Sequence, residues 1–150
     1  MDKRKKILNE LLVQIFNDIL QIEEQSLKQG VINDLSVTEI HTIDAIGMYT
    51  ERTMSEVAQD LKITVGTLTT AINKLIKKGY VERKRIEEDR RVVLVSLTEI
   101  GKKVFDVHSV FHKEMIDGIL ENFKGDELDV LTKALGKANR FFERKYESLN

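Results

Sequence analysis

Apolar residues recur along the first third of the chain with the period of amphipathic helices. Over 4–28 they fall at three- and four-residue steps, which predicts one long helix with a wide apolar stripe. The motif Ser36-Val-Thr-Glu39 has the spacing of a capping box and predicts a second helix that ends near Gly47. Another capping box, Thr53-Met-Ser-Glu56, predicts a short third helix, and residues 48–52 connect the two.

The next segment predicts a helix followed by a β-hairpin. The fourth helix spans 64–78, and Gly79 ends it in the left-handed conformation. Residues 80–85 and 92–97 alternate between apolar and polar positions, which favours two antiparallel strands. The charged residues 86–91 form the hairpin tip between them. Helix, turn, helix and hairpin in this order are typical of a winged helix-turn-helix.

Two more helices are predicted after the hairpin. Thr98 caps a fifth helix over 99–123. Asp126 and Glu127 suit the first turn of a sixth helix, which continues through Tyr146. The expected fold class is therefore mainly α, a winged helix-turn-helix with six helices plus a two- or three-stranded antiparallel β-wing.

The distribution of apolar surface predicts a homodimer. We expect one domain over 1–150, in which 35–98 is the DNA-binding unit and 4–28 and 99–149 are dimerisation helices. The terminal helices carry more apolar surface than a core of ~70 residues absorbs. Duplex DNA also favours a two-fold symmetric reader, because half-sites one turn apart place two recognition helices ~34 Å apart.

Composition narrows the class of protein. Cysteine is absent, which excludes a disulfide framework and thiolate metal ligands. No apolar run approaches the ~18 residues of a membrane span, and MDKRKK leads into an amphipathic segment, so a cytoplasmic protein without a membrane partner is expected. Net charge is −1, yet residues 74–91 hold eight Lys or Arg against four acids, which makes this segment +4 and the remainder −5. A basic stripe on an acidic body is the electrostatic pattern of a DNA-binding surface.

The outer face of the fourth helix is small, polar and basic, and it contains no acid. Short side chains let a helix lie deep in a major groove, where threonine methyls meet thymine methyls and Asn73 pairs with adenine. A winged helix that binds only other proteins is a competing class, and the acid-free face favours DNA. The predicted contacts on this helix are Thr64, Val65, Gly66, Thr67, Thr69, Thr70, Asn73, Lys74 and Lys77.

The chain resembles the MarR family of transcriptional regulators over nearly its whole length. The family's wing motif is Asp, any residue, Arg, five residues and Leu-Thr; here it is Asp89-Arg90-Arg91, VVLVS and Leu97-Thr98. The resemblance implies that Arg91 enters the minor groove, that Asp89 braces it, and that Arg90 makes a phosphate or groove contact. A narrow minor groove attracts a guanidinium. The resemblance also implies a repressor that binds a palindromic operator in double-stranded DNA. The sequence shows no nucleophile elbow, phosphate-binding loop or paired-carboxylate arrangement, so an enzyme is not expected.

Four phrases are most similar to the family's repressors of fatty-acid synthesis genes. They are EIHTIDAIG (39–47), ITVGTLTTAINKL (63–75), RKRIEEDRRVV (83–93) and VFHKEM (110–115). This resemblance implies that acyl carrier protein bearing a long acyl chain is a corepressor that strengthens DNA binding, with no other cofactor. Carrier proteins are acidic, so docking lysines are expected at Lys102, Lys103 and Lys113, or in the run at 3–6.

The resemblance also implies an effector site between the first, second and fifth helices. An acyl chain needs an apolar space there, and each candidate also reads as an ordinary core residue. The candidates are Phe16, Ile19, Ile40, His41, Ile43, Phe105, His108, Phe111, His112 and Met115.

The histidines leave an alternative open. His108 and His112 are four residues apart on one helix face, which is a metal-ligand spacing. Zinc-sensing relatives in the family place an acid and three histidines on these helices, so Glu24 and His41 would complete the site of a zinc-responsive repressor. Those relatives use further ligands, often a cysteine, which this chain lacks. We favour histidines that are satisfied by hydrogen bonds, without a bound metal.

Overall fold

The computed structural model describes residues 1–30, 32–48 and 50–149. It comprises two compact units, Met1–Phe111 and His112–Asn150. A single domain over 1–150, with dimerisation helices at both ends, stays a prediction.

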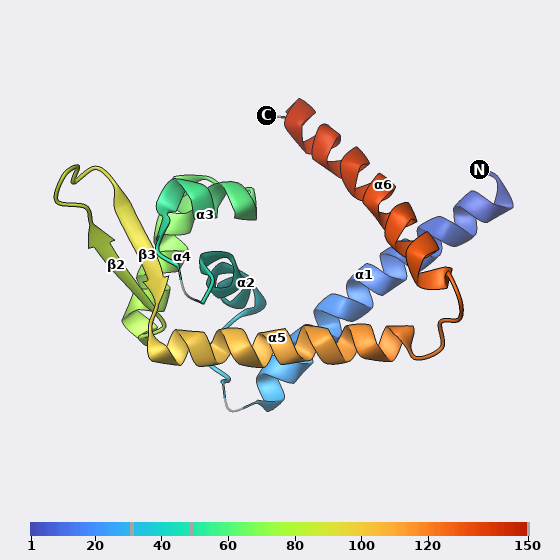
Figure 1. Ribbon diagram of the computed structural model, residues 1–150, viewed down its shortest axis with the longest axis horizontal. Coiled ribbons are helices and arrows are strands. Elements are labelled where there is room, and N and C mark those ends of the chain that lie inside the picture. Colours follow the sequence, from blue (N-terminus) through green and yellow to red (C-terminus); the bar gives the residue numbers. More distant parts are fainter. Residues whose placement is uncertain (31, 49, 150) are drawn as a thin grey trace. The chain divides into compact units, whose positions relative to one another are not determined.

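The described residues form six helices and one three-stranded sheet, as the sequence predicted (Figure 1). The elements are α1 (Lys3–Gln29), α2 (Val37–Ile46), β1 (Arg52–Thr53), α3 (Met54–Leu61), α4 (Val65–Lys78), β2 (Val81–Arg85), β3 (Val93–Leu97), α5 (Glu99–Leu120) and α6 (Glu127–Leu149). Helix α5 begins in the first unit and ends in the second.

Both predicted capping boxes begin helices, but only one half of each forms. The Ser36 hydroxyl accepts a hydrogen bond from the Glu39 backbone N–H at 3.2 Å, and Thr53 accepts from that of Glu56 at 3.1 Å. The Glu39 carboxylate does not close its box. It accepts from Lys78 Nζ at 2.8 Å and so joins the start of α2 to the end of α4.

The sheet is antiparallel and has the strand order β1-β3-β2. Strands β2 and β3 pair without a break from Val81↔Leu97 to Arg85↔Val93, and their tip extends beyond α3 and α4 (Figure 1). Strand β1 pairs Arg52 with Val95 inside the segment predicted as a connector. Two residues are too short to show an alternating pattern, so the third strand was not located from the sequence.

The core lies in the first unit, where α2, α3 and α4 pack against one another and against the sheet. Leu68, Ile72 and Leu75 on α4 are fully buried, as the helical period predicted. The opposite face of α4 is exposed, so burial fixes which side of this helix faces outward.

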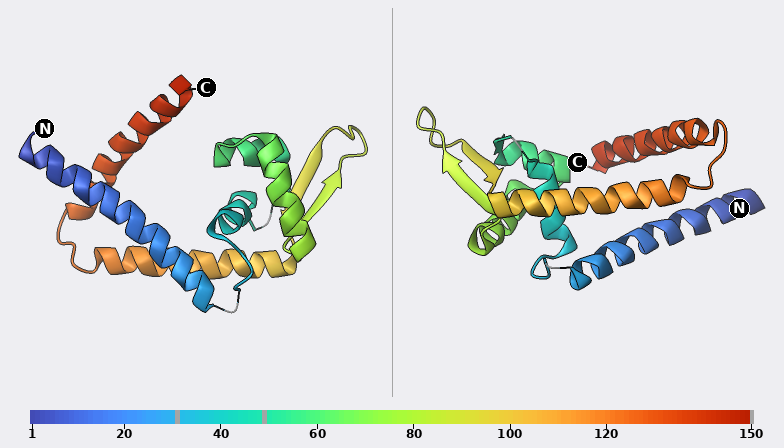
Figure 2. Two further views of the ribbon diagram at one scale, coloured as in Figure 1. Left: turned by 180° about the vertical axis from the view of Figure 1, so that it is seen from behind. Right: turned by 60° about the horizontal axis from the view of Figure 1, so that its bottom comes forward.

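The end of α4 lies beside the start of α5 (Figure 2), and hydrogen bonds from the Thr98 hydroxyl and backbone N–H join the two ends. Gly79 takes the left-handed conformation with φ 87°, and its carbonyl accepts from the Thr98 hydroxyl at 2.7 Å. The Thr98 backbone N–H donates to the Tyr80 carbonyl at 3.1 Å. Gly101 lies so close to that carbonyl oxygen that a Cβ at this position would be 2.1 Å from it.

Helices α1 and α6 leave long apolar faces uncovered. Glu23 is the one residue of α1 that is buried, and none is buried among the described residues of α6. Among the described residues, no helix combines the length and hydropathy that crossing a membrane requires. The large exposed apolar residues include Ile7, Leu8, Leu11, Leu12, Ile15 and Phe16 on α1, and Leu128, Val130, Leu135, Phe141 and Phe142 on α6.

Gly101→Ala is expected to destabilise the fold by about 1–3 kcal/mol, because the new methyl group must push backbone away from backbone. Gly118→Ala is the control, since it lies in the same helix and a Cβ there meets nothing within 4 Å. The control is expected to gain up to about 1 kcal/mol from helix propensity. Urea denaturation measures both changes, and equal stability of the two variants would contradict the close approach.

Candidate nucleic-acid interface and effector cavity

The exposed face of α4 carries the residues that the sequence predicted. Thr64, Val65, Gly66, Thr67, Thr70, Asn73, Lys74 and Lys77 are exposed, and Thr69 is half-buried. The hydroxyls of Thr69 and Thr70 donate to the carbonyls of Val65 and Gly66, at 2.8 and 3.4 Å. These threonines therefore satisfy their hydroxyls within the helix, which suits a surface that contacts DNA through methyl groups.

The tip of the hairpin holds an arginine in a fixed fork. Arg91 Nε and Nη2 donate to the two carboxylate oxygens of Asp89 at 2.9 and 3.1 Å, and the Arg91 backbone N–H adds a bond at 3.1 Å. The Arg91 side chain is 91% exposed. The Arg91 guanidinium lowers the pKa of Asp89, with its backbone N–H contributing, and Asp89 in turn raises the pKa of Arg91. Both groups are thus charged at neutral pH, as a braced groove-binding arginine requires.

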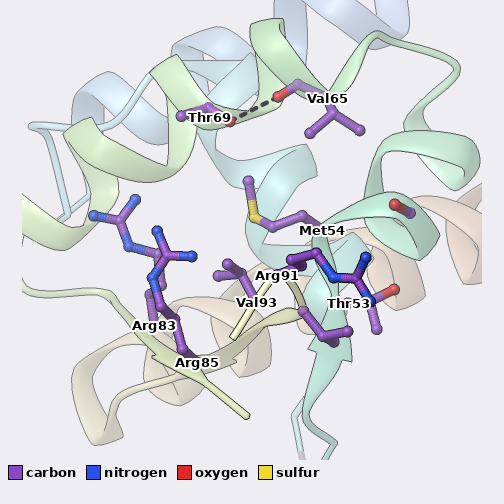
Figure 3. A pocket seen from close by; sticks show the side chains of 10 residues that line it. Thr53, Met54, Val65, Thr69, Arg83, Arg85, Arg91 and Val93 are labelled. Atoms are coloured by element: carbon purple, nitrogen blue, oxygen red, sulfur yellow. Dashed lines mark hydrogen bonds between the residues drawn. The ribbon is translucent and has the colours of Figure 1, made fainter. Parts of the chain in front are cut away.

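Two further cations on β2 were not singled out from the sequence. Val81 is buried, and strand alternation places Arg83 and Arg85 on the same side of β2. Figure 3 shows both guanidiniums at a cleft of about 530 Å³ that Arg91 also lines. The other lining residues are Thr53, Met54 and Ser55 at the start of α3, Val65 and Thr69 of α4, and Val92 and Val93.

This cleft has the chemistry of a phosphate site. Three guanidiniums and the positive end of the α3 dipole face one space between α3, α4 and the hairpin. Arg83 also donates to the Asn73 side-chain oxygen at 2.7 Å, which fixes the orientation of an amide on α4. The backbone carbonyl of Arg90 accepts from Arg85 at 2.7 Å and ties the tip to β2. The sequence signal for Arg83 and Arg85 is that they follow the buried strand residue Val81 at two-residue steps, which places all three on one side of β2.

A separate, mostly apolar cavity of about 180 Å³ lies between α1, α2, α5 and the connection from α1 to α2. Ile40, His108 and Phe111 of the predicted effector residues line it. The remaining lining residues are Glu23, Ser26, Leu27, Gly30, Ile32, Val104 and Val107.

The other predicted effector residues lie elsewhere. Helical periodicity identifies the apolar faces of helices, but it does not say which faces meet. Phe16 is exposed, Ile19 is half-buried, Ile43 is in the core, Phe105 packs on that core, His41 bonds Glu23, and His112 and Met115 belong to the second unit.

Two of the cavity-lining residues, the buried Glu23 and His108, belong to a polar cluster with the half-buried His41 and Asp44. Glu23 Oε1 is 2.9 Å from His41 Nε2 and 2.5 Å from His108 Nε2. His108 Nδ1 is 2.5 Å from an Asp44 carboxylate oxygen. The acid that meets the histidines is therefore Glu23 and not Glu24. One residue turns a helix by about 100°, and the exposed Glu24 pairs with Lys28 at 2.9 Å.

The cluster stabilises its own charged forms. Burial opposes the charged forms of His108 and Glu23. For His108, hydrogen bonds to Asp44 and Glu23 outweigh burial and raise the pKa. For Glu23, burial is likewise outweighed by hydrogen bonds with His108 and His41, and the pKa falls below its ordinary value. The ligand atoms of Glu23, His41 and His108 lie within 4.8 Å of one another. Imidazole and carboxylate suit zinc, and Asp44 would orient the His108 ring as a supporting acid.

Comparisons relate the chain to known proteins. The family described as "Transcriptional regulator SarA/Rot" matches residues 25–107, more than half of the chain. Streptococcus pneumoniae FabT, solved in complex with DNA, has a TM-score of 0.89 and 41% identity, and the match covers 93% of this chain and 98% of that one. A MarR protein from Peptoclostridium difficile has a TM-score of 0.81 and 25% identity over 100% and 94%. The HTH-type transcriptional regulator BilQ of Clostridium symbiosum is 31% identical over 73% and 76%.

This chain therefore belongs to the MarR family of winged helix-turn-helix transcriptional regulators. The three relatives are regulators, which agrees with the expectation that the chain is not an enzyme.

Arg91→Ala is expected to weaken DNA binding by about 1–3 kcal/mol, because the wing loses the guanidinium that is predicted to enter the minor groove. Asp89→Asn keeps Arg91 but removes its charged brace, so we expect a smaller loss. Fluorescence anisotropy on palindromic duplexes selected from random DNA measures both variants.

Lys137→Ala, an exposed site on α6, is the control because it removes one positive charge outside the hairpin. Unchanged affinity of the Arg91 variant on several selected duplexes would contradict the assignment of the wing.

Proposed function

We propose that this regulator is a homodimeric repressor of fatty-acid synthesis genes. It binds a palindromic operator more tightly when acyl carrier protein delivers a long acyl chain. The observation that carries the proposal is the 41% identity, over 93% of the chain, to FabT, which was solved in complex with DNA. The sequence phrases that resemble fatty-acid synthesis repressors support the same gene class.

The proposed contacts with DNA follow from the exposed chemistry. Helix α4 enters the major groove with its threonine methyls and Asn73, and Arg91 enters the adjacent minor groove. The cleft with Arg83 and Arg85 holds a backbone phosphate between them. Each neutralised phosphate releases counterions, so binding weakens as salt rises.

The uncovered faces of α1 and α6 support the homodimer. An exposed row of large apolar residues, as each of these two helices carries, is unusual on a monomer in water. A second copy of the chain covers the same surfaces on both protomers, as two-fold symmetry requires. The dimer also allows both half-sites of a palindrome to be bound together.

The cavity supports an acyl ligand. Each buried CH₂ group contributes about 0.8 kcal/mol, so an alkyl chain gains affinity from an apolar lining without any specific contact. A volume of about 180 Å³ is close to the ~150 Å³ of a cavity that accepts benzene, far below that of a long acyl chain. The acyl chain therefore binds a state of the protein in which the cavity lining has opened. A ligand that selects one state shifts the equilibrium between the two states.

The predicted docking lysines differ in their surroundings. Lys102 donates to Glu99 at 3.0 Å, Lys113 pairs with Asp117, and Lys103 is exposed. An acidic carrier protein would replace the weak surface partners of the first two. These lysines stay a proposal for the docking patch.

Palmitoyl-acyl carrier protein is expected to raise operator affinity about 5- to 150-fold over the carrier without an acyl chain, the range of ordinary allosteric coupling. Titration of labelled operator in the presence of each carrier form measures the ratio. The unacylated carrier separates an effect of docking from an effect of the chain. Equal affinity with both forms would refute the corepressor and leave the DNA-binding assignment intact.

A second candidate function is a zinc-responsive repressor. The observation that favours it is the convergence of the buried Glu23 and His108 and the half-buried His41 on one point, with Asp44 behind His108. Bound zinc would link α1, α2 and α5 through these three side chains, in place of the hydrogen bonds that now link them. The chain's own residues supply three ligands there, and water would complete a tetrahedral set.

Zinc at equimolar concentration is expected, under this second function, to change operator affinity of the wild type and of Glu24→Gln but not of Glu23→Gln. Glu24 is the matched control because it is the neighbouring acid on α1 and pairs with Lys28 outside the cluster. Anisotropy with zinc or with a chelator measures the effect. No response of the wild type to zinc would eliminate this function.

A further inference from the structure

The connection between α1 and α2 contacts the end of α4, which is the recognition helix of the proposed function. Asp34 lies in this connection, and its carboxylate accepts from the Tyr80 hydroxyl at 2.6 Å. Its backbone carbonyl accepts from Lys78 Nζ at 2.5 Å. Lys78 is the last residue of α4, and Tyr80 follows the glycine that ends it. Asp34 thus binds both sides of the α4 terminus.

The bond to Tyr80 is part-buried, because it joins a buried tyrosine to an exposed aspartate. Tyr80 is 7% exposed, and burial, together with the hydrogen bond to Asp34, raises its pKa to about 12. The phenol therefore keeps its proton at neutral pH and remains the donor. A hydrogen bond to a charged acceptor is worth more than one between two neutral groups.

The same connection forms part of the cavity wall. Gly30 and Ile32 line the cavity, and Leu27 lies at the preceding turn of α1. Ile32 and Asp34 are two residues apart, so their Cα atoms are separated by no more than about 7 Å. Asp34 therefore lies next to the cavity wall along the chain while its side chain contacts the end of α4.

Tyr80 is anchored at two points. Its backbone carbonyl is held by Thr98 and by the close approach of Gly101. Its hydroxyl donates to Asp34, which lies two residues after the cavity-lining Ile32. We propose that Asp34 is the positioning residue through which occupancy of the cavity sets the position of the recognition helix. This relay rests on the proposed function, in which an apolar ligand enters the cavity.

A double-mutant cycle tests the relay without any ligand. Ser26 is an exposed residue at the edge of the cavity, where Ser26→Phe offers a ring to the apolar lining, and Tyr80→Phe removes the hydroxyl that bonds Asp34. Ser26→Phe is expected to change operator affinity at least about fivefold in the wild-type background. In the Tyr80→Phe background the same change is expected to stay within about twofold, the level at which uncoupled sites behave additively.

Three further variants separate positioning from folding. Asp34→Asn retains an oxygen that accepts from Tyr80 and is expected to preserve the coupling, whereas Asp34→Ala is expected to lose it. Ser26→Leu repeats the cycle with a smaller side chain, and the thermal midpoint of every variant is recorded. A merely structural role would lower stability and affinity together without changing the ratio that the cycle measures.

The outcomes distinguish the relay from the proposed function. An equal effect of Ser26→Phe in both backgrounds, or no effect of either cavity-filling variant, would overturn the relay. A response to palmitoyl-acyl carrier protein that persists in Tyr80→Phe would overturn it too, with the proposed function retained. Coupling in the cycle without any wild-type response to that carrier would support the relay and refute the acyl ligand.

Discussion

The structure of the DNA-binding unit depends on a place where two backbones touch. Gly101 of α5 approaches the Tyr80 carbonyl so closely that no side chain fits between them. Because this contact has no flexible atoms, it fixes the end of α4 relative to the start of α5. The buried face of α4 then sets the rotation of the helix, and the exposed threonine face follows from these two constraints.

Local chemistry made much of this fold predictable. Ser36 and Thr53 were identified as caps because a side-chain oxygen at that position satisfies an N–H that the helix leaves unpaired, and both bonds form. Gly79 was identified because few other residues accept its backbone conformation. Strand β1 carried no such signal, since two residues show no period and its pairing with β3 is set by a partner distant in sequence.

The sites were less predictable because they depend on which surfaces meet. The charge of the hairpin was visible in the sequence. To place Arg83 and Arg85 at the cleft, they had to be assigned to the same side of β2 as the buried Val81. Likewise, the sequence indicated an acid near the histidines, and only the packing of α1 selects Glu23. A prediction from single-helix faces therefore names the right elements more often than the right residues.

The polar cluster and the apolar cavity form one environment. Glu23 and His108 are buried charges, and such charges are tolerated where each has a partner. No buried side-chain nitrogen or oxygen in the described residues lacks a hydrogen bond. His108 contributes its full stabilisation of the fold below its ordinary pKa of 6.5, and this stabilisation is lost as the pH rises through its raised pKa. Glu23 contributes its full stabilisation above its ordinary pKa of 4.5, and this stabilisation is lost as the pH falls through its lowered pKa. Acid therefore weakens the junction of α1, α2 and α5 through Glu23, and base weakens it through His108.

The strand order also protects the protein from its own copies. Strand β2 lies at an edge of the sheet, where unpaired N–H and C=O groups invite a strand from another molecule. Four of its five residues are charged and exposed, so a second β2 would bring like charges together and require them to lose water. The cations that suit a polyanion thus also keep the wing from pairing edge to edge, and neutralising them for any purpose removes both effects at once.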